Sequence, residues 1–450
     1  MAVTLLDVTE EQLLEGRLLK TVGVVRFLEG QVAGEKDTKD IVVDDDHGPR
    51  HGGCIGRLGG VSGQNCLRSL GMRLPAEGGD QWALLDSNQQ PIGYEPTALT
   101  IELRALPSQP IESPGPCNPK AEEPVANDFL SRLFDLQDRV LDAVRGALAH
   151  KTTDELSRSV RDDAGDTIFG IDVPAEDALI SACEEWGRAQ SFLLMAEGLE
   201  PEGRRFGSGD PEFRLIVDPV DGSRGLMHDK RSAWCLSAVA SERGEDTRME
   251  HVFAACMTEL PTTKQGYIDR LWTSRGEAVQ GHRKELATGD VRALSIQPSQ
   301  ESTLHNGFGT VADYFPGGKE IIGRVAEKIL TEEMGGWNPN KANVFSDQYI
   351  SSGGQLAELI LGRDRFVMDI RPLVFRKLGA ESSLCALPYD LCTTLIAEQT
   401  GVIVTEPDGS PFNPPLDITT NVAFAAYANA GLAARMQPIV SRVLHECGLL

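Results

Sequence analysis

Long apolar runs are missing from this chain of 450 residues, and no segment has the length of a transmembrane helix. The basic start and apolar stretch of a secretory signal are missing as well, because residues 1–11 are acidic. These two absences predict a cytoplasmic protein with no membrane partner.

Paired cysteines and excess positive charge are also scarce. The nine cysteines are an odd number and form no Cys-x-x-Cys pair, which argues against a disulfide framework and against a zinc site. With 43 basic and 67 acidic residues the net charge is −24, which argues against a nucleic-acid polymer as partner. A small phosphorylated substrate stays open, because a bound divalent cation can reverse the charge of one site.

Steady hydrophobic periodicity is absent from residues 1–124, which contain glycine-rich turns and end near a proline-rich tract at 107–116. We expect a poorly ordered extension that is no functional domain. Residues 85–105 resemble the translation of a transfer-RNA gene read antisense. The resulting hypothesis is a start codon assigned too far upstream, with translation beginning near Val125. The rival interpretation is a genuine accessory domain that binds a partner or covers the active site.

Regular patterns begin at Asn127, where apolar residues start to recur at helical spacing. Helices and short strands then alternate to the end of the chain, which predicts a layered α/β domain. We expect an α+β subdomain at 125–300, which would bind metal, and an α/β subdomain at 301–450. The expected strands are 191–196, 213–217, 233–240, 252–257, 365–368 and 402–405, and the expected helices are 127–148, 173–186, 319–333, 354–361 and 390–399.

The sharpest motif is Asp218-Pro-Val-Asp-Gly-Ser-Arg-Gly, at the end of a hydrophobic strand. Two carboxylates three residues apart at a strand end could share Mg²⁺ ions, which prefer hard oxygen ligands. The backbone N–H groups of Gly222 and Ser223 could point at a phosphate. The alternative is an ordinary Asp-Gly turn, as expected for Pro407-Asp-Gly-Ser, which has no second acid three residues earlier.

This motif resembles the Asp-Pro-Ile-Asp-Gly-Thr-x-Asn signature of the inositol monophosphatase-like family. That superfamily of Mg²⁺-dependent, lithium-sensitive phosphatases also includes fructose-1,6-bisphosphatase and nucleotide 3′-phosphatases. Four further segments resemble family motifs in the same order, over about residues 125–450. They are 166–172, with Asp166 and Asp172; 193–198, with Glu197; the glycine-rich helix start at 352–359; and 387–401, with Asp390.

The resemblance implies a layered α-β-α-β-α sandwich, the sugar-phosphatase fold, and hydrolysis of a phosphate monoester by metal-activated water. It implies two or three Mg²⁺ ions, with Mn²⁺ as a substitute. The metal ligands would be four carboxylates and one backbone carbonyl, namely Glu197, Asp218, Asp221, Asp390 and the carbonyl of Val220. Without cations, several carboxylates brought together would repel one another, which independently favours a metal site.

Further roles follow from the same resemblance. Ser223, held by Asp172, would orient the attacking water, and Glu197 would take part in catalysis beside them. Arg161 stands where the family carries a lysine near the site, and Asp166 would hold its loop. Each acid also has a plainer interpretation, since Asp172 and Asp390 could simply cap helices and Glu197 could be solvated.

Several positions depart from the family pattern, so the substrate cannot be carried over. Gly198, Gly225 and Tyr389 replace a second glutamate, an asparagine and a tryptophan. Asp369 and Arg371 could touch substrate, and the alternative is a plain surface loop over the extra stretch 371–383. The basic cluster after the signature (Arg224, His228, Lys230 and Arg231) could contact a second phosphate or a nucleotide, or form a solvated loop.

The expected substrate is a small phosphorylated metabolite such as an inositol or sugar phosphate. The alternatives are a nucleotide 3′-phosphatase or a sugar bisphosphatase on the same scaffold, and an inactive relative that only binds metal. The family resemblance also allows a homodimer.

Overall fold

The computed structural model describes residues 24–27, 41–44, 126–162, 167–380 and 384–450. The chain divides into two units, residues 1–114 and 115–450. In the first unit, the described residues are strands β1 (Val24–Phe27) and β2 (Ile41–Asp44), which pair antiparallel. The rest of the expected extension, with the proline-rich tract and residues 85–105, lies outside the described residues.

An eight-stranded sheet forms the larger half of the second unit, in the order β12-β11-β10-β9-β8-β7-β5-β6. Neighbouring strands run antiparallel except β5 and β7, which run parallel. The strands are β5 (Phe192–Ala196), β6 (Arg204–Phe206), β7 (Phe213–Asp221), β8 (Ala233–Ser241), β9 (Val252–Leu260), β10 (Tyr267–Ser274), β11 (Gln280–Glu285) and β12 (Val291–Ala293).

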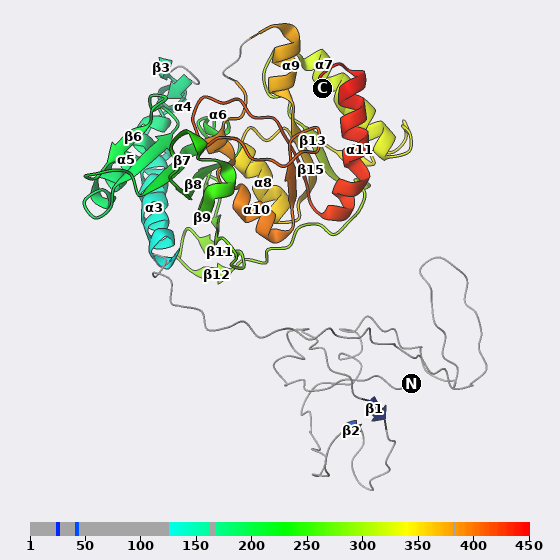
Figure 1. Cartoon of the computed structure of the whole chain (residues 1–450), viewed down its shortest axis with the longest axis horizontal. Coiled ribbons are helices and arrows are strands. Elements are labelled where there is room, and N and C mark those ends of the chain that lie inside the picture. Colours follow the sequence, from blue (N-terminus) through cyan, green and yellow to red (C-terminus); the bar gives the residue numbers. More distant parts are fainter. Residues whose placement is uncertain (1–23, 28–40, 45–125, 163–166, 381–383) are drawn as a thin grey trace, which may run out of the picture. The chain divides into compact units, whose positions relative to one another are not determined.

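Two helices, α3 (Ala126–His150) and α5 (Asp172–Trp186), cover one face of this sheet (Figure 1). Helix α3 begins one residue before the expected Asn127, and its apolar stripe from Phe129 to Val144 is buried against the strands. Short elements connect these parts: α4 (Thr153–Leu156), β3 (Ser159–Asp162), β4 (Thr167–Phe169), α6 (Ser223–Leu226), η1 (Gly244–Asp246) and η2 (Met249–His251).

A five-stranded sheet, in the order β14-β13-β15-β17-β16, forms the other half. Its strands are β13 (Gly307–Val311), β14 (Val344–Phe345), β15 (Asp364–Asp369), β16 (Ile403–Thr405) and β17 (Phe424–Tyr427). The outer face of this sheet packs against α7 (Lys319–Glu333), α9 (Arg371–Leu378) and α11 (Ala430–Glu446).

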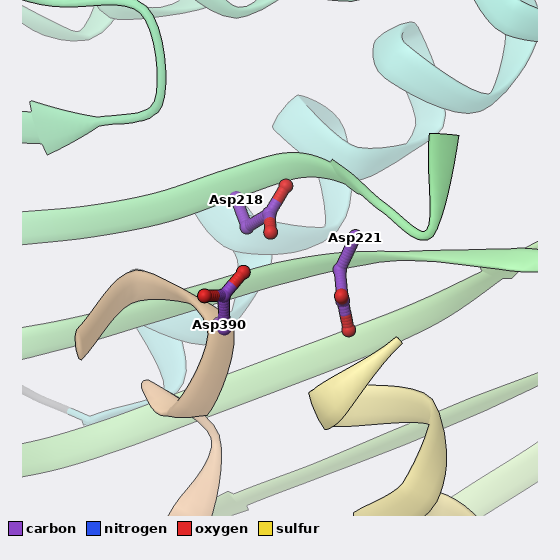
Figure 2. A group of neighbouring side chains, drawn as sticks. All are labelled: Asp218, Asp221 and Asp390. Atoms are coloured by element: carbon purple, nitrogen blue, oxygen red, sulfur yellow. The ribbon is translucent and has the colours of Figure 1, made fainter. Parts of the chain in front are cut away.

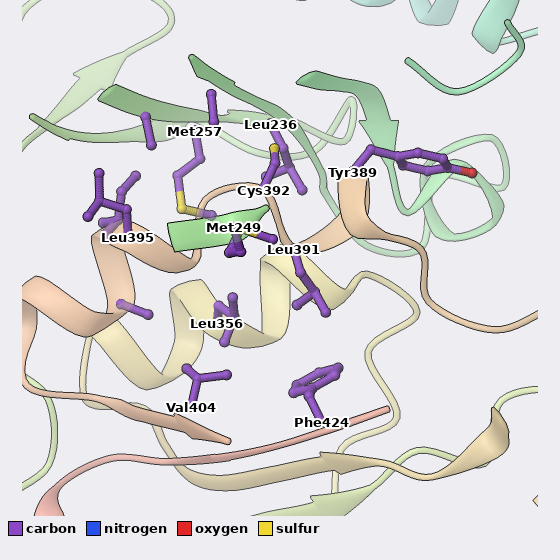
Figure 3. Close-up of a cluster of buried hydrophobic side chains, with 14 of the residues drawn as sticks. Leu236, Met249, Met257, Leu356, Tyr389, Leu391, Cys392, Leu395, Val404 and Phe424 are labelled. Atoms are coloured by element: carbon purple, nitrogen blue, oxygen red, sulfur yellow. The ribbon is translucent and has the colours of Figure 1, made fainter. Parts of the chain in front are cut away.

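The core between the two sheets contains α8 (Ser352–Ile360), the 3-10 turn η3 (Pro388–Leu391) and α10 (Thr394–Thr400). Figure 3 shows part of this core, in which Leu356 of α8 lies between the two sheets. The first sheet contributes Leu236 and Met257, and the second contributes Val404 and Phe424. The layers are therefore helix, sheet, helix, sheet, helix, and the expected α-β-α-β-α sandwich is confirmed.

Two expectations about local structure were wrong. Residues 371–378 form helix α9 and no surface loop, with Pro372 in the first turn, where its missing N–H costs nothing. The expected helix 390–399 is divided into η3 and α10. Across the described part of the chain, no helix combines the length and hydropathy that crossing a bilayer requires.

Candidate active site

The end of strand β7 supplies two buried carboxylates. Asp218 is 2% exposed and Asp221 is 5% exposed. The pairing of β7 with β8 becomes irregular between these two residues, where Pro219 has no N–H to donate to the neighbouring strand. The N–H of Val220 turns back to Asp218 Oδ1 at 2.9 Å. The strand therefore ends in a local kink that carries both acids on the wall of one cleft.

Asp390 of η3 reaches the same place from the C-terminal part of the chain. One carboxylate oxygen from each of Asp218, Asp221 and Asp390 lies within 4.8 Å of the others, and Figure 2 shows the three groups around one space. Glu197, in the turn after β5, lines the same cleft. Segments that are nearly 200 residues apart in sequence thus bring four acids to one cleft.

Burial and mutual repulsion act strongly on these carboxyl groups. Burial, with the negative charge of Asp390, raises the pKa of Asp221 to about 8. Burial, with the charges of Glu197, Asp221 and Asp390, holds the pKa of Asp218 well above its usual range. A cluster of hard oxygen donors with excess negative charge fits divalent cations such as Mg²⁺ or Mn²⁺. The three aspartates can therefore hold a metal ion.

The start of helix α8 fixes the orientation of Asp221. Its Oδ2 accepts hydrogen bonds from Ser351 Oγ and from the N–H of Gly353, both at 2.7 Å. Its Oδ1 accepts from the N–H of Ser352 at 3.2 Å. Position 353 has no room for a side chain, because a Cβ there would lie 2.9 Å from Asp221 Oδ2 and 2.5 Å from a methyl group of Leu236.

A serine and an aspartate form a hydrogen-bonded pair beside the acids. Gly222, with φ of 106°, turns the chain out of β7, and Ser223 follows at the start of α6. Ser223 Oγ lies 2.6 Å from Asp172 Oδ1 and 2.9 Å from the carbonyl of Val220. Asp172 Oδ2 accepts from the N–H of Phe169 at 2.8 Å. Asp172 is the first residue of α5 and the N-cap is Ile171, with no side-chain cap hydrogen bond, so the interpretation of Asp172 as a simple cap was wrong.

No family model and no curated protein matches the sequence. Among solved structures, the fructose-1,6-bisphosphatase of Leishmania major in its holo form matches with a TM-score of 0.53 and 14% sequence identity. The match covers 71% of this chain and 95% of that one. The chain has the inositol monophosphatase-like fold. The resemblance expected from the motifs is therefore confirmed at the level of the fold.

Two further solved structures match with lower scores. The extragenic suppressor protein SuhB from Bartonella henselae has a TM-score of 0.48 and 15% identity, over 70% of this chain and 99% of that one. A hypothetical protein from Pyrococcus horikoshii, titled as having similarities to inositol-1 monophosphatase, has a TM-score of 0.46 and 16% identity. That match covers 70% of this chain and 98% of the other.

On this inositol monophosphatase-like fold, Asp369 and Arg371 form a buried ion pair, so the interpretation as an exposed loop was wrong. They are 1% and 5% exposed. Arg371 Nε lies 3.0 and 2.9 Å from the two oxygens of Asp369, Nη2 also donates to Asp369, and Nη1 donates to the carbonyl of Leu384. Arg371 lines the cleft, while the hydrogen-bond capacity of its guanidinium is largely used within the protein.

The supporting residue Arg161 does not line the cleft. Arg161 on β3 pairs with Glu176 at 2.8 Å and donates to the carbonyl of Gly198 at 3.2 Å. Through this second contact it reaches the turn that carries Glu197. Asp166 lies outside the described residues.

Several residues that line the cleft were not assigned to the site from the sequence. Tyr314 and Phe315, in the loop after β13, and Ser351 before α8 line the same cleft as the acids. An aromatic pair in a loop gives no signal by itself, because the fold brings it there from about 90 residues away. Ser351 could have been noticed as a helix N-cap, since its side chain accepts from the N–H of Gly354.

Proposed function

We propose that this chain is a Mg²⁺-dependent phosphomonoesterase that releases inorganic phosphate from a small phosphorylated metabolite. One observation carries the proposal: the three-aspartate cluster and Glu197 share a cleft with Ser223, whose hydroxyl is hydrogen-bonded to Asp172. A bare metal-binding site would need the acids alone. The added hydroxyl–carboxylate pair is what activation of a water molecule requires.

In this proposal Glu197, Asp218, Asp221, Asp390 and the carbonyl of Val220 hold two or three Mg²⁺ ions, or Mn²⁺ in their place. When bound, the ions supply positive charge to the phosphoryl oxygens and increase the acidity of the attacking water. The acidic side chains determine where the positive charge of the bound ions lies in the cleft. The contacts of Asp221 with Ser351 and Gly353 keep its oxygens directed at the cleft.

Ser223 orients the attacking water. A hydroxyl that donates its single hydrogen to Asp172 keeps its lone pairs as acceptors, so it can take a hydrogen bond from the water. This directs a lone pair of the water at phosphorus. As the new P–O bond forms and the ester P–O bond breaks, the proton of the water passes to Ser223 Oγ, the serine proton passes to Asp172, and the departing alkoxide takes up a proton from solvent to leave as the alcohol. Gly222 and Ser223 would also offer backbone N–H groups to the phosphate.

The test is Mg²⁺-dependent phosphate release from a panel of phosphorylated metabolites, which includes inositol monophosphates, sugar mono- and bisphosphates and nucleoside 3′-phosphates. We expect turnover that disappears with EDTA and returns with Mg²⁺ or Mn²⁺. Millimolar Li⁺ should lower it, because this set of carboxylates resembles that of the lithium-sensitive members. Tight Mg²⁺ binding without phosphate release from any member of the panel would favour the inactive, metal-binding relative.

A further inference from the structure

Two tyrosines lie beside helix α8, and each ring is covered by an arginine. Tyr349 precedes the helix, and the Cζ atom of Arg231 lies 3.6 Å from its ring centroid. Tyr314 comes from the loop after β13, and the Cζ atom of Arg371 lies 4.7 Å from its ring centroid. Tyr314 lines the cleft together with the acids, whereas Tyr349 does not. The chain thus contains one phenol in the site and a similar one outside it.

The hydroxyl hydrogen of Tyr349 is used within the protein. Its Oη donates to the carbonyl of Ser232 at 2.9 Å, and the residue is 4% exposed. A buried hydroxyl normally has such an acceptor, because an unmade hydrogen bond in the interior is costly. Tyr349 therefore has a structural role.

The hydroxyl of Tyr314 is bonded in the opposite sense. Gln355, whose side chain is buried in α8, donates from Nε2 to Tyr314 Oη. A phenol has one hydrogen of its own, and this bond does not use it. Among the described residues, Gln355 is the one hydrogen-bond partner of this hydroxyl. Burial, with the charge of Asp369, raises the pKa of Tyr314 above its usual range, so the hydroxyl keeps its hydrogen.

Contacts on three sides hold the phenol in place. The guanidinium covers the ring, Phe315 packs against it edge-on with 5.9 Å between the ring centroids, and Gln355 holds the oxygen. Gln355 lies one helical turn after Ser351, and its N–H donates to the carbonyl of Ser351 at 3.0 Å. Ser351 in turn donates to Asp221, so the phenol and this candidate metal ligand are held by the same end of α8.

We infer that Tyr314 binds the substrate, with its hydroxyl donating a hydrogen bond to an oxygen of the phosphate ester in the cleft. This inference rests on the proposed function, which gives this residue no role. The acceptor is a phosphoryl oxygen or a hydroxyl oxygen of the alcohol part, since both have lone pairs that a phenol can meet. Tyr314 contributes to binding and takes no part in the proton transfers.

The experiment measures kcat and KM of Tyr314→Phe in the full chain, with the best substrate of the panel. The variant keeps the ring and loses the hydroxyl, so kcat/KM should fall mainly through a higher KM. We expect a loss of about 3-fold for a hydroxyl acceptor and about 10- to 100-fold for a charged phosphoryl oxygen. The inhibition constant of inorganic phosphate should rise by a similar factor in the second case and stay unchanged in the first.

Two controls separate this role from a structural one. Tyr349→Phe also removes a phenol hydroxyl beside α8, but outside the cleft, so it should lower Tm and leave kcat/KM at the wild-type value. Gln355→Leu breaks the same hydrogen bond while the Tyr314 hydroxyl stays. Its loss of kcat/KM should therefore be smaller than that of Tyr314→Phe.

Wild-type kcat/KM in Tyr314→Phe would overturn the inference. An equal loss in Tyr314→Phe and Gln355→Leu would overturn it as well, because the bond between the two side chains would then explain the effect. If Tyr314→Phe does not fold, as judged by circular dichroism, Gln355→Glu replaces it, since a carboxyl group there can accept the phenol hydrogen and withdraw it from the substrate. An unchanged KM of that variant at saturating Mg²⁺ overturns the inference equally. In these cases phosphate is still released and the proposed function stands, whereas release from no substrate at all would remove the proposed function itself.

Discussion

The letters Asp-Gly-Ser occur at two places in the described part of the chain, at 221–223 and at 408–410, with opposite surroundings. Both glycines have positive φ, 106° at Gly222 and 95° at Gly409, so the chain uses the left-handed region at the glycine of both segments. Asp221 is buried at the end of β7, whereas residues 408–410 are exposed in a turn after β16. The local sequence thus determines the conformation of the glycine, whereas the fold determines whether the aspartate beside it is buried or exposed.

The surroundings of Asp221 and Asp408 shift the pKa values of the two carboxyl groups in opposite directions. Asp408 Oδ1 accepts from the hydroxyl of Ser410 at 2.7 Å and from its N–H at 2.8 Å, and these bonds lower the pKa of Asp408. At the buried copy, the serine hydroxyl instead lies 2.6 Å from the distant Asp172, and burial beside Asp390 raises the pKa of Asp221. In the turn at 408–410, hydrogen bonds from Ser410 stabilise the charge of Asp408. The buried carboxyl group of Asp221 must instead take up a proton or bind a cation.

The largest effect is expected for Asp221→Asn, compared with Asp408→Asn. Loss of a charged ligand should lower Mg²⁺-dependent turnover by about a thousandfold or more, since water activation depends on the bound cation. Asp408→Asn should leave turnover unchanged. Phosphate release at saturating Mg²⁺, with circular dichroism as the check on folding, measures both. Equal activity of the two variants would show that the buried copy has no special role.

Ser223→Ala should lower kcat by about a hundredfold and change KM less, because the hydroxyl acts on the attacking water and not on the bound ester. Ser223→Thr keeps the hydroxyl and should retain most activity. Ser410→Ala is the matched change in the exposed copy and should have no effect on kcat. A threonine variant as impaired as the alanine variant would contradict this role for the hydroxyl.

A smaller effect is expected from Gly353→Ala, which sharpens the comparison by disturbing the support of Asp221 and the neighbouring Leu236 without removing a metal-binding group. The new Cβ would lie 2.9 Å from Asp221 Oδ2, so the carboxylate must move. We expect the Mg²⁺ concentration for half-maximal activity to rise about tenfold, as for other residues that hold a metal ligand. Gly323→Ala in α7, where nothing lies within 4 Å of a new Cβ, is the control. The same Mg²⁺ requirement in both variants would contradict the account.

The smallest effect concerns pH and stability. The pKa of Asp221 in the folded, metal-free protein is about 8, above the unfolded value of 3.8. A group whose pKa is raised by folding stabilises the protein below its unfolded pKa, and that stabilisation is lost as pH rises toward 8. Mg²⁺ should therefore raise Tm more at pH 8 than at pH 6, by about 2 °C or more. Asp221→Asn should reduce this difference and Asp408→Asn should keep it. Equal Mg²⁺-induced increases in Tm at pH 6 and pH 8 would contradict the expected effect of the buried Asp221 carboxylate.

The sequence predicts those parts of the fold that carry a strong local pattern. Helix α7 has the expected bounds 319–333, because one apolar stripe runs its full length. Strand β11 was missed because its six residues, Gln280–Glu285, are largely polar and have little hydrophobic patterning. Helix α11 was not expected, and it carries Pro438 in its interior, which weakens a helical pattern.

For the site, motifs indicated the acids and the contact between Ser223 and Asp172, but not the residues that hold Asp221. Asp218 and Asp221 share one strand end, so their proximity follows from their spacing. Ser351 touches Asp221 across 130 residues, and such a contact leaves no mark in either segment. Asp369 and Arg371 were seen as a candidate pair, but their burial depends on α9, which the sequence did not reveal.

The most direct test of the difference between the two Asp-Gly-Ser segments, 221–223 and 408–410, is to locate a bound metal ion. Crystals soaked in MnCl₂ and measured at the manganese absorption edge locate Mn²⁺ by its anomalous scattering, independently of any substrate. We predict strong peaks within ligand distance of the carboxylates of Asp218, Asp221 and Asp390, and none at Asp408. A peak at Asp408, or no peak among the three buried acids, would contradict it.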